Sequence, residues 1–111
     1  MGRRKIYPEW HVPRSVVNMV HAVCGDYYRR RMAISQRDVD GAVFDEYVRL
    51  NSVIDTALTE IEDILQETLL SNVADGVGYD KSYAAMFLSR NAYYRRRNKF
   101  IHDVAVGLRF V

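Results

Sequence analysis

The spacing of apolar residues in the first third of the chain predicts one helix. Between Ser15 and Met32, apolar side chains recur at steps of three and four residues, as on one face of an amphipathic helix. The stripe consists of Val16, Val20, Val23, Cys24, Tyr27 and Tyr28. We expect Ser15 to cap this helix and Gly25 to mark close packing or a bend, since glycine weakens a helix by roughly 1 kcal/mol relative to alanine. The polar run from Ala33 to Gly41 predicts a connection.

The clearest periodic segment runs from Ala42 to Ala74 and predicts one long amphipathic helix. Its apolar seam consists of Tyr47, Leu50, Ile54, Ala57, Ile61, Ile64 and Thr68, widened by Leu58, Leu65 and Leu69. Charged residues such as Asp55 and Glu62 lie between the seam positions and are expected in solvent. The seam faces either the first helix or a second chain. We favour packing within the chain, with homodimerisation as the alternative, because so few heptads are weak evidence for a coiled coil.

Glycines after this segment predict a stop, followed by a second helical unit. Gly76 stands where a helix C-cap takes a left-handed residue. We then predict a short helix that begins at Tyr79 or Asp80 and runs through Phe87, a break at Leu88 and Ser89, and a last helix to Leu108 with Ser89 as its N-cap. The core face of the last helix should consist of Tyr93, Phe100, Ile101, Val104, Ala105 and Leu108. This order of elements is that of a helix-turn-helix over residues 80–108.

The composition fits an all-α protein with one long amphipathic helix. We expect an N-terminal arm of residues 1–14, followed by a single helical domain of residues 15–111. Hydrophobic residues make up 49% of the 111 residues and charged residues 27%, which is ordinary for a globular protein. The two prolines, Pro8 and Pro13, precede every predicted helix. The single Cys24 is expected to be reduced and in the core. Without an apolar run of membrane or signal-peptide type, a cytoplasmic location is expected.

Charge is segregated along the chain, although the net charge is only +2. Between Asp38 and Glu67 there are nine acidic residues and one arginine, whereas between Ser89 and Asp103 there are five basic residues and one acid. A basic helix after a turn suits a polyanion such as DNA. The triplet Arg29 to Arg31 lacks that setting. We interpret it as a solvated cluster at a helix end, with a phosphate contact as the alternative.

The last predicted helix has side chains that can read DNA. Arginine binds guanine and asparagine binds adenine through two hydrogen bonds, and tyrosine reaches a phosphate or a thymine methyl group. Helical spacing places five residues of this helix on the face that points away from the core, namely Arg90, Asn91, Tyr94, Arg95 and Asn98. Arg96, Arg97 and Lys99 are expected on backbone phosphates, and Ser89 leaves the helix N-terminus free for another phosphate.

The C-terminal half of the chain resembles a known family. The similarity lies in the run Leu88-Ser89-Arg90-Asn91-Ala92-Tyr93-Tyr94-Arg95-Arg96-Arg97, followed by Lys99-Phe100-Ile101 and Val104-Ala105. Upstream it lies in Asn51, Ile54, Asp55, Ala57 and Leu58. Over roughly the last sixty residues this pattern resembles the ArpU/RinA-like phage transcriptional regulators. The resemblance implies a helix-turn-helix similar to sigma-factor region 4, a recognition helix from Ser89 to Lys99, and the activation of phage or prophage genes.

The sequence has no pattern typical of an enzyme. It lacks a Ser/His/Asp or Cys/His set and a glycine-rich phosphate loop, and its three histidines and one cysteine lack the spacing of metal ligands. We therefore expect a non-enzyme without a cofactor that binds double-stranded DNA, with RNA polymerase as a second candidate partner. The alternative is a helical phage assembly or DNA-packaging component, similar to a small terminase, that oligomerises through the long helix.

Overall fold

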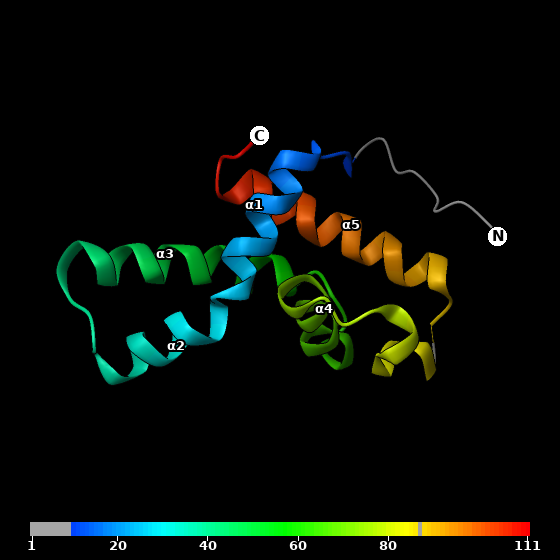
Figure 1. Ribbon diagram of the computed structural model, residues 1–111, viewed down its shortest axis with the longest axis horizontal. Helices are drawn as coiled ribbons and strands as arrows, with labels where there is room; N and C mark the ends of the chain where they lie inside the picture. The colour runs from blue at the N-terminus through cyan, green and yellow to red at the C-terminus, as the bar shows by residue number, and fades with distance from the viewer. Residues whose placement is uncertain (1–9, 87) are drawn as a thin grey trace.

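The computed structural model describes residues 10–86 and 88–111, and of Tyr83 only the backbone. Within these ranges the chain is all-α (Figure 1). In chain order the elements are α1 (Arg14–Gly25), α2 (Tyr27–Gln36), α3 (Gly41–Leu58), α4 (Asp63–Asp75), η2 (Tyr79–Lys81), η3 (Tyr83–Met86) and α5 (Arg90–Gly107). The elements η2 and η3 are short 3₁₀ helices.

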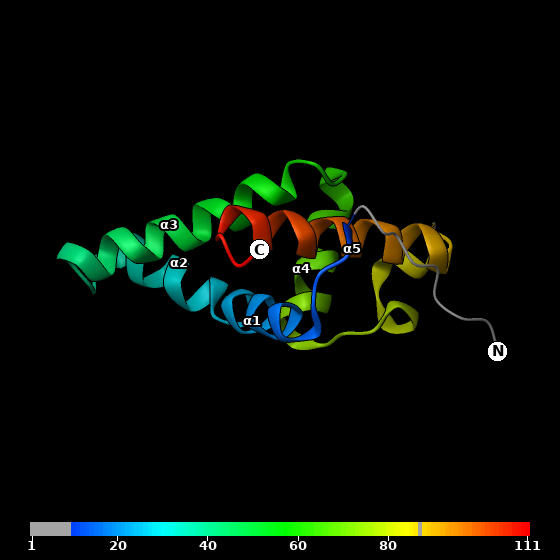
Figure 2. The ribbon, with the colours of Figure 1, turned by 90° about the horizontal axis from the view of Figure 1, so that it is seen from above.

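The core lies where α1, α4, α5 and the second half of α3 meet. Helix α1 packs against α4 and α5, and α5 also packs against α3, as Figures 1 and 2 show from two directions. The largest fully buried side chains are Tyr93, Phe100, Ile54, Leu69, Leu70, Val20, Val73, Val104 and Cys24. Helix α2 packs against α3, with hydrogen bonds to Asn51 and Asp55, and the two form a hairpin that projects from the core (Figure 1).

The helix predicted for residues 15–32 is divided into α1 and α2 by a bend. Ser15 is not the cap, because Pro13 takes that position and its carbonyl oxygen accepts hydrogen bonds from the next N–H groups of the helix at 2.9 and 3.0 Å. The bend falls at Asp26 (φ −98°, ψ 7°), directly after Gly25, which confirms the expected packing site or bend. Helix α2 continues to Gln36, four residues into the predicted connection, and ends at the left-handed Arg37 (φ 53°).

The prediction of one long helix over residues 42–74 is wrong, because the chain turns a corner between α3 and α4. The hydroxyl of Thr59 donates to the Thr56 carbonyl oxygen at 2.6 Å, and Glu62 is extended (φ −53°, ψ 135°). The corner buries Ile61, whereas Ile64, which the predicted seam placed inside, is 58% exposed. The apolar period continues through the corner because both helices contribute residues to the same core.

The short helix predicted for residues 80–87 is also wrong. The 3₁₀ helices η2 and η3 occupy this stretch, and the extended Ser82 (φ −98°, ψ 160°) separates them. The Ser82 hydroxyl donates to the Tyr79 carbonyl oxygen at 2.8 Å, and such local bonds compete with helix propagation. A segment this short is at best a marginal α-helix. Two tight turns therefore stand where the first helix of the expected helix-turn-helix was placed; Phe87 lies outside the described residues.

Two other local predictions are confirmed. Gly76 ends α4 in the left-handed conformation (φ 75°), and Cys24 is a free, buried cysteine. Burial raises the pKa of the Cys24 thiol to about 12, so the thiol stays protonated at neutral pH. None of the described helices has the length and apolar character needed to cross a membrane.

Candidate nucleic-acid interface

Helix α5 is fixed by a cap at its start and by a buried face along its length. The side-chain oxygen of Ser89 accepts a hydrogen bond from the Ala92 N–H at 3.1 Å, as predicted for an N-cap. All the side chains expected on the core face are buried, namely Tyr93, Phe100, Ile101, Val104, Ala105 and Leu108. Both predictions are confirmed, and together they set which face of α5 is left for a ligand.

The opposite face of α5 has a polar stripe, which consists of Asn91, Arg95, Asn98 and His102. Steps of three and four residues place these side chains on one side of the helix. Asn91 and Arg95 are exposed, whereas Asn98 and His102 are half-buried. The predicted outward position is confirmed for Asn91 and Arg95. Tyr94, predicted in the same set, instead packs against the core.

Arg95 contacts the segment that precedes α1. Its guanidinium carbon lies 5.0 Å from the centre of the Trp10 ring, within the range of a cation–π interaction. The contact places the start of the described chain beside the polar stripe, and Arg95 remains exposed. The two residues lie near opposite ends of the chain, and no local sequence pattern links them.

Arg90 is tied to the turns that precede α5. Its guanidinium donates to Oδ1 of Asp80 at 2.6 Å and lies 5.0 Å from the centre of the Tyr79 ring. The hydrogen bond to Asp80 raises the pKa of Arg90. Both side chains of the pair are more than half exposed, and such pairs contribute little to stability. A phosphate can therefore replace Asp80 as the partner of Arg90 at small cost.

Arg96 forms a bidentate ion pair with Glu62 at the corner between α3 and α4. Its Nε and Nη2 atoms lie 2.9 and 2.6 Å from the carboxylate oxygens. The hydrogen bond from Arg96 lowers the pKa of Glu62 to about 2. Arg96 is 27% exposed and Glu62 50% exposed. The geometry supports a role for Arg96 in joining two elements and offers no support for the expected phosphate contact.

Arg97 belongs to a polar cluster between α1, α4 and α5. Its Nε donates to Oδ1 of Asn72 at 2.6 Å, and its Nη2 lies 3.3 Å from Nε2 of His21. Nδ1 of His21 lies 2.7 Å from the Val73 carbonyl oxygen. The Asn72 amide donates to the Val77 carbonyl oxygen at 2.6 Å. The cluster therefore links three helices, and Arg97 is positioned as a structural residue.

Lys99, the third expected phosphate ligand, pairs with Asp103 one helical turn further along α5. The two charged groups are 2.7 Å apart, and both side chains are about one-third exposed. Together with Arg96 and Arg97, Lys99 completes a set of three cations with partners inside the chain. In contrast, Asn91 and Arg95 present their side chains to solvent.

The arginine triplet in α2 is not the uniformly solvated cluster that we expected. Arg29 and Arg31 are exposed, but Arg30 is only 3% exposed. Nε of Arg30 donates to Oδ1 of Asn51 at 2.7 Å and its Nη2 to the Val23 carbonyl oxygen at 2.6 Å, while burial lowers its pKa. Consecutive helix positions differ by about 100°, so a triplet cannot lie on a single face. The sequence does not indicate which member is buried.

Comparison with models of known protein families, with curated proteins and with solved structures found no match. The resemblance to the ArpU/RinA-like regulators therefore rests on the residues quoted for it. In the described part of the chain, no group of three or more His, Cys, Asp or Glu side chains is arranged to hold a metal ion.

Proposed function

We propose that the protein is a sequence-specific regulator of transcription that binds double-stranded DNA with the first half of α5 in the major groove. The observation that carries this proposal is the polar stripe on α5, where Asn91 and Arg95 are exposed one helical turn apart. Asparagine and arginine are the side chains that pair with adenine and guanine through two hydrogen bonds. In this proposal, the turns η2 and η3 replace the first helix of a helix-turn-helix unit. A role on phage or prophage genes follows from the resemblance alone.

Phosphate contacts are assigned to the start of α5. The first N–H groups of a helix have no partner within the helix and favour an anion. Arg90 is exposed at this end, and the exposed Lys81 lies in η2. Arg96, Arg97 and Lys99 are given a structural role instead, because each is half-buried and paired within the chain, whereas the Arg90–Asp80 pair is exposed.

The test is a comparison of two arginine variants on a selected duplex. Duplexes are first enriched from a random pool with the wild-type protein, and affinity is then measured at several salt concentrations. Arg95→Ala should weaken binding by about 1–3 kcal/mol, or roughly five- to 150-fold, and relax the preference at one base pair. Arg49→Ala removes the same charge from an exposed pair on α3 and should leave affinity unchanged. Undetectable binding of the wild type at low salt would contradict the proposal.

A second candidate, an assembly or packaging component, is favoured by the projecting hairpin of α2 and α3, which leaves apolar side chains exposed. A heterologous contact through such a surface builds a ring when the rotation between neighbours closes. Light scattering separates the candidates: a ring-sized particle favours assembly, whereas a monomer or dimer is compatible with the regulator.

A further inference from the structure

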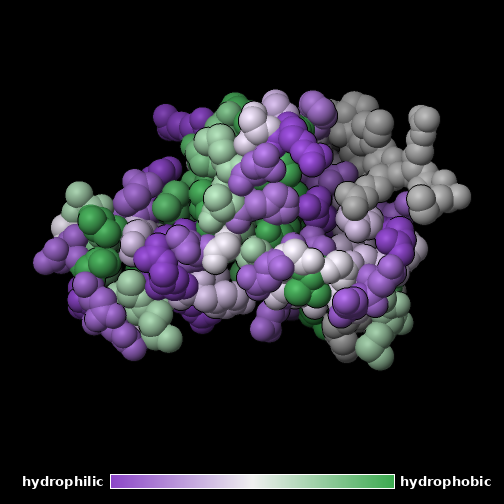
Figure 3. Space-filling view, in the orientation of Figure 1, coloured by the Kyte–Doolittle hydropathy of each residue, from purple (hydrophilic) through white to green (hydrophobic). Residues whose placement is uncertain are grey.

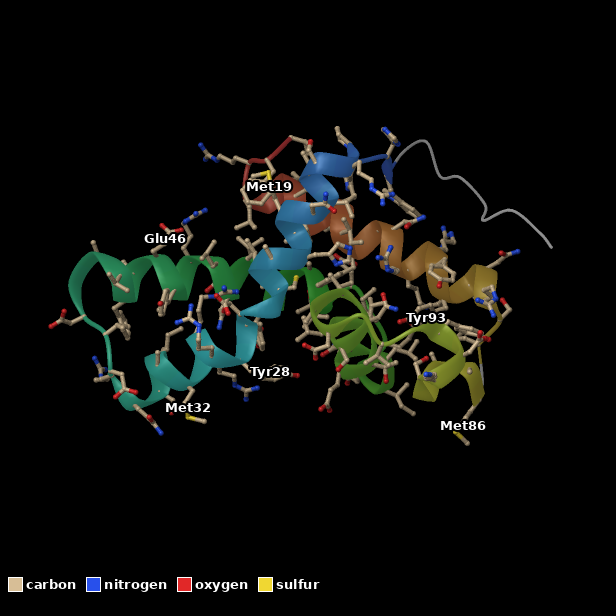
Figure 4. The ribbon with its side chains drawn as sticks, in the orientation of Figure 1. Met19, Tyr28, Met32, Glu46, Met86 and Tyr93 are labelled. Atoms are coloured by element: carbon tan, nitrogen blue, oxygen red, sulfur yellow. The ribbon has the colours of Figure 1, made fainter. Side chains whose placement is uncertain are left out.

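The hairpin formed by α2 and the first half of α3 has no buried residue between Arg31 and Leu50. Its large apolar side chains include Met32, Ile34, Val43, Phe44, Val48 and Leu50. Met32, Val43 and Val48 are 57%, 49% and 37% exposed. Figure 4 shows Met32 pointing away from α3, and Figure 3 shows apolar surface beside hydrophilic surface over this hairpin. Two helices that pack only on each other cannot enclose their apolar residues, whereas a bundle of four helices can.

An open groove of about 460 Å³ lies between α2 and α3 on one face of the hairpin. Ile34 and Val48 contribute its apolar lining, Arg31 lies on the α2 side, and Asp55 lies on the α3 side. Arg31 is exposed and forms no ion pair with a described residue. Asp55 accepts a hydrogen bond from the Tyr27 hydroxyl at 2.5 Å and is otherwise open to a cation. The two sides of the groove therefore have opposite charges.

One arginine of α2 faces this groove. Arg31 lines it, whereas Arg30 is buried against Asn51 and Arg29 pairs with Asp26 at 2.9 Å. When two copies are related by a two-fold axis along the hairpins, residues at the same height along the axis face one another, so Arg31 of each copy faces Asp55 of the other. The groove is therefore complementary to itself in charge, and Ile34 and Val48 add apolar surface to it.

We propose that this groove is a homodimer interface in which the hairpins of two copies form a four-helix bundle, with Arg31 of each copy paired to Asp55 of the other. The bundle would cover Ile34 and Val48. Because the interface lies on α2 and α3, the proposal goes beyond DNA binding and does not depend on it. If both proposals hold, the dimer presents two copies of α5, and the selected DNA site should be palindromic.

A charge-exchange experiment tests the interface in the absence of DNA. Analytical ultracentrifugation of the wild type should give twice the 12.9 kDa chain mass. Arg31→Glu and Asp55→Lys each place like charges opposite one another, so each variant alone should dissociate at least about tenfold more readily. An equimolar mixture of the two variants restores two opposite-charge pairs in a heterodimer and should again give the mass of a dimer.

Two further variants control for folding and for position. Val48→Glu puts a charge into the groove and should give a monomer with unchanged helicity by circular dichroism. Val43→Glu changes a more exposed valine of the hairpin that does not line the groove, and the dimer should persist. A monomeric wild type at tens of micromolar, a particle larger than a dimer, or a mixture no more associated than its components would overturn the proposal.

Discussion

Tyr93 is the largest fully buried side chain, and the described residues offer its hydroxyl no hydrogen-bond partner. Its ring lies 5.3 Å from that of Tyr79 and 5.5 Å from that of Tyr94, so aromatic packing holds it in place. Burial raises the pKa of Tyr93 to about 12. Tyr79 differs, because its hydroxyl donates to the Leu88 carbonyl oxygen. The unpaired Tyr93 hydroxyl therefore destabilises the fold, whereas the bonded Tyr79 hydroxyl stabilises it.

Replacement of Tyr93 by phenylalanine should therefore stabilise the protein. A buried, unpaired polar group costs about 1–3 kcal/mol, so Tyr93→Phe is expected to raise the free energy of unfolding by about 1 kcal/mol in urea denaturation. Tyr79→Phe is the matched control and should lower it, since the Leu88 carbonyl oxygen loses its donor. A loss of stability in Tyr93→Phe comparable to that in Tyr79→Phe would mean that the Tyr93 hydroxyl has a partner.

At the scale of elements, one ion pair holds the corner between α3 and α4 against α5. Glu62 is the residue that precedes α4, yet its side chain makes no capping bond and reaches Arg96 instead. An exposed pair is screened by solvent and typically contributes about 1 kcal/mol or less. Its effect on the fold is therefore mainly to fix where the chain turns, 34 residues before Arg96.

The Glu62–Arg96 pair should make stability depend on pH below neutrality. The pKa of Glu62 is lowered in the folded state from 4.5 to about 2, so its stabilising contribution is complete above about pH 4.5 and is lost as the pH falls toward 2. The difference in free energy of unfolding between the wild type and Glu62→Gln should shrink over this window and with added salt.

Glu46→Gln is the control for this experiment, because Glu46 pairs with Arg49 inside a single turn of α3. Its loss should not affect the packing of α5 against the corner. A stability difference between the wild type and Glu62→Gln that stays constant from pH 6 to pH 2 would contradict the role assigned to this pair.

At the scale of the molecule, the close crossing of α3 and α5 joins the two proposed surfaces. A β-carbon placed on Gly107 would lie 2.6 Å from Cγ1 of Val53, closer than real contacts allow. Gly107 is therefore required by the approach of the two helices. The same α3 continues into the hairpin proposed for dimerisation, and the same α5 begins with the polar stripe proposed for DNA.

Gly107→Ala should destabilise the protein although alanine favours helices. Alanine gains roughly 1 kcal/mol in helix propensity, but overpacking costs about 1–3 kcal/mol, and valine is stiff about χ1. We expect a net loss of up to about 2 kcal/mol in thermal or urea unfolding. The double variant Gly107→Ala/Val53→Ala removes the clashing methyl groups and should be less destabilised than the sum of its single variants. Additive effects would show that the crossing tolerates the extra methyl group.

Local sequence patterns predict the helical class of this chain and much of its local geometry. The core face of α5, the Ser89 cap, the left-handed Gly76 and the bend after Gly25 were all predicted, because helical periodicity and capping depend on neighbours within about four residues. The same reasoning placed Asn91 and Arg95 in solvent. Periodicity could not predict the corner at Thr59 or the 3₁₀ turns. Apolar residues keep the same spacing whether the chain continues as one straight helix or turns and packs against the same core.

Which arginines bond to residues of other helices depends on the packing of the helices. Arg96, Arg97 and Arg30 look equivalent to Arg95 in the sequence, but their partners Glu62, Asn72 and Asn51 lie 34, 25 and 21 residues away on other helices. Spacing along one helix defines a face and carries no information about the groups opposite that face. Packing therefore separated the arginines that hold helices together from those whose side chains stay exposed.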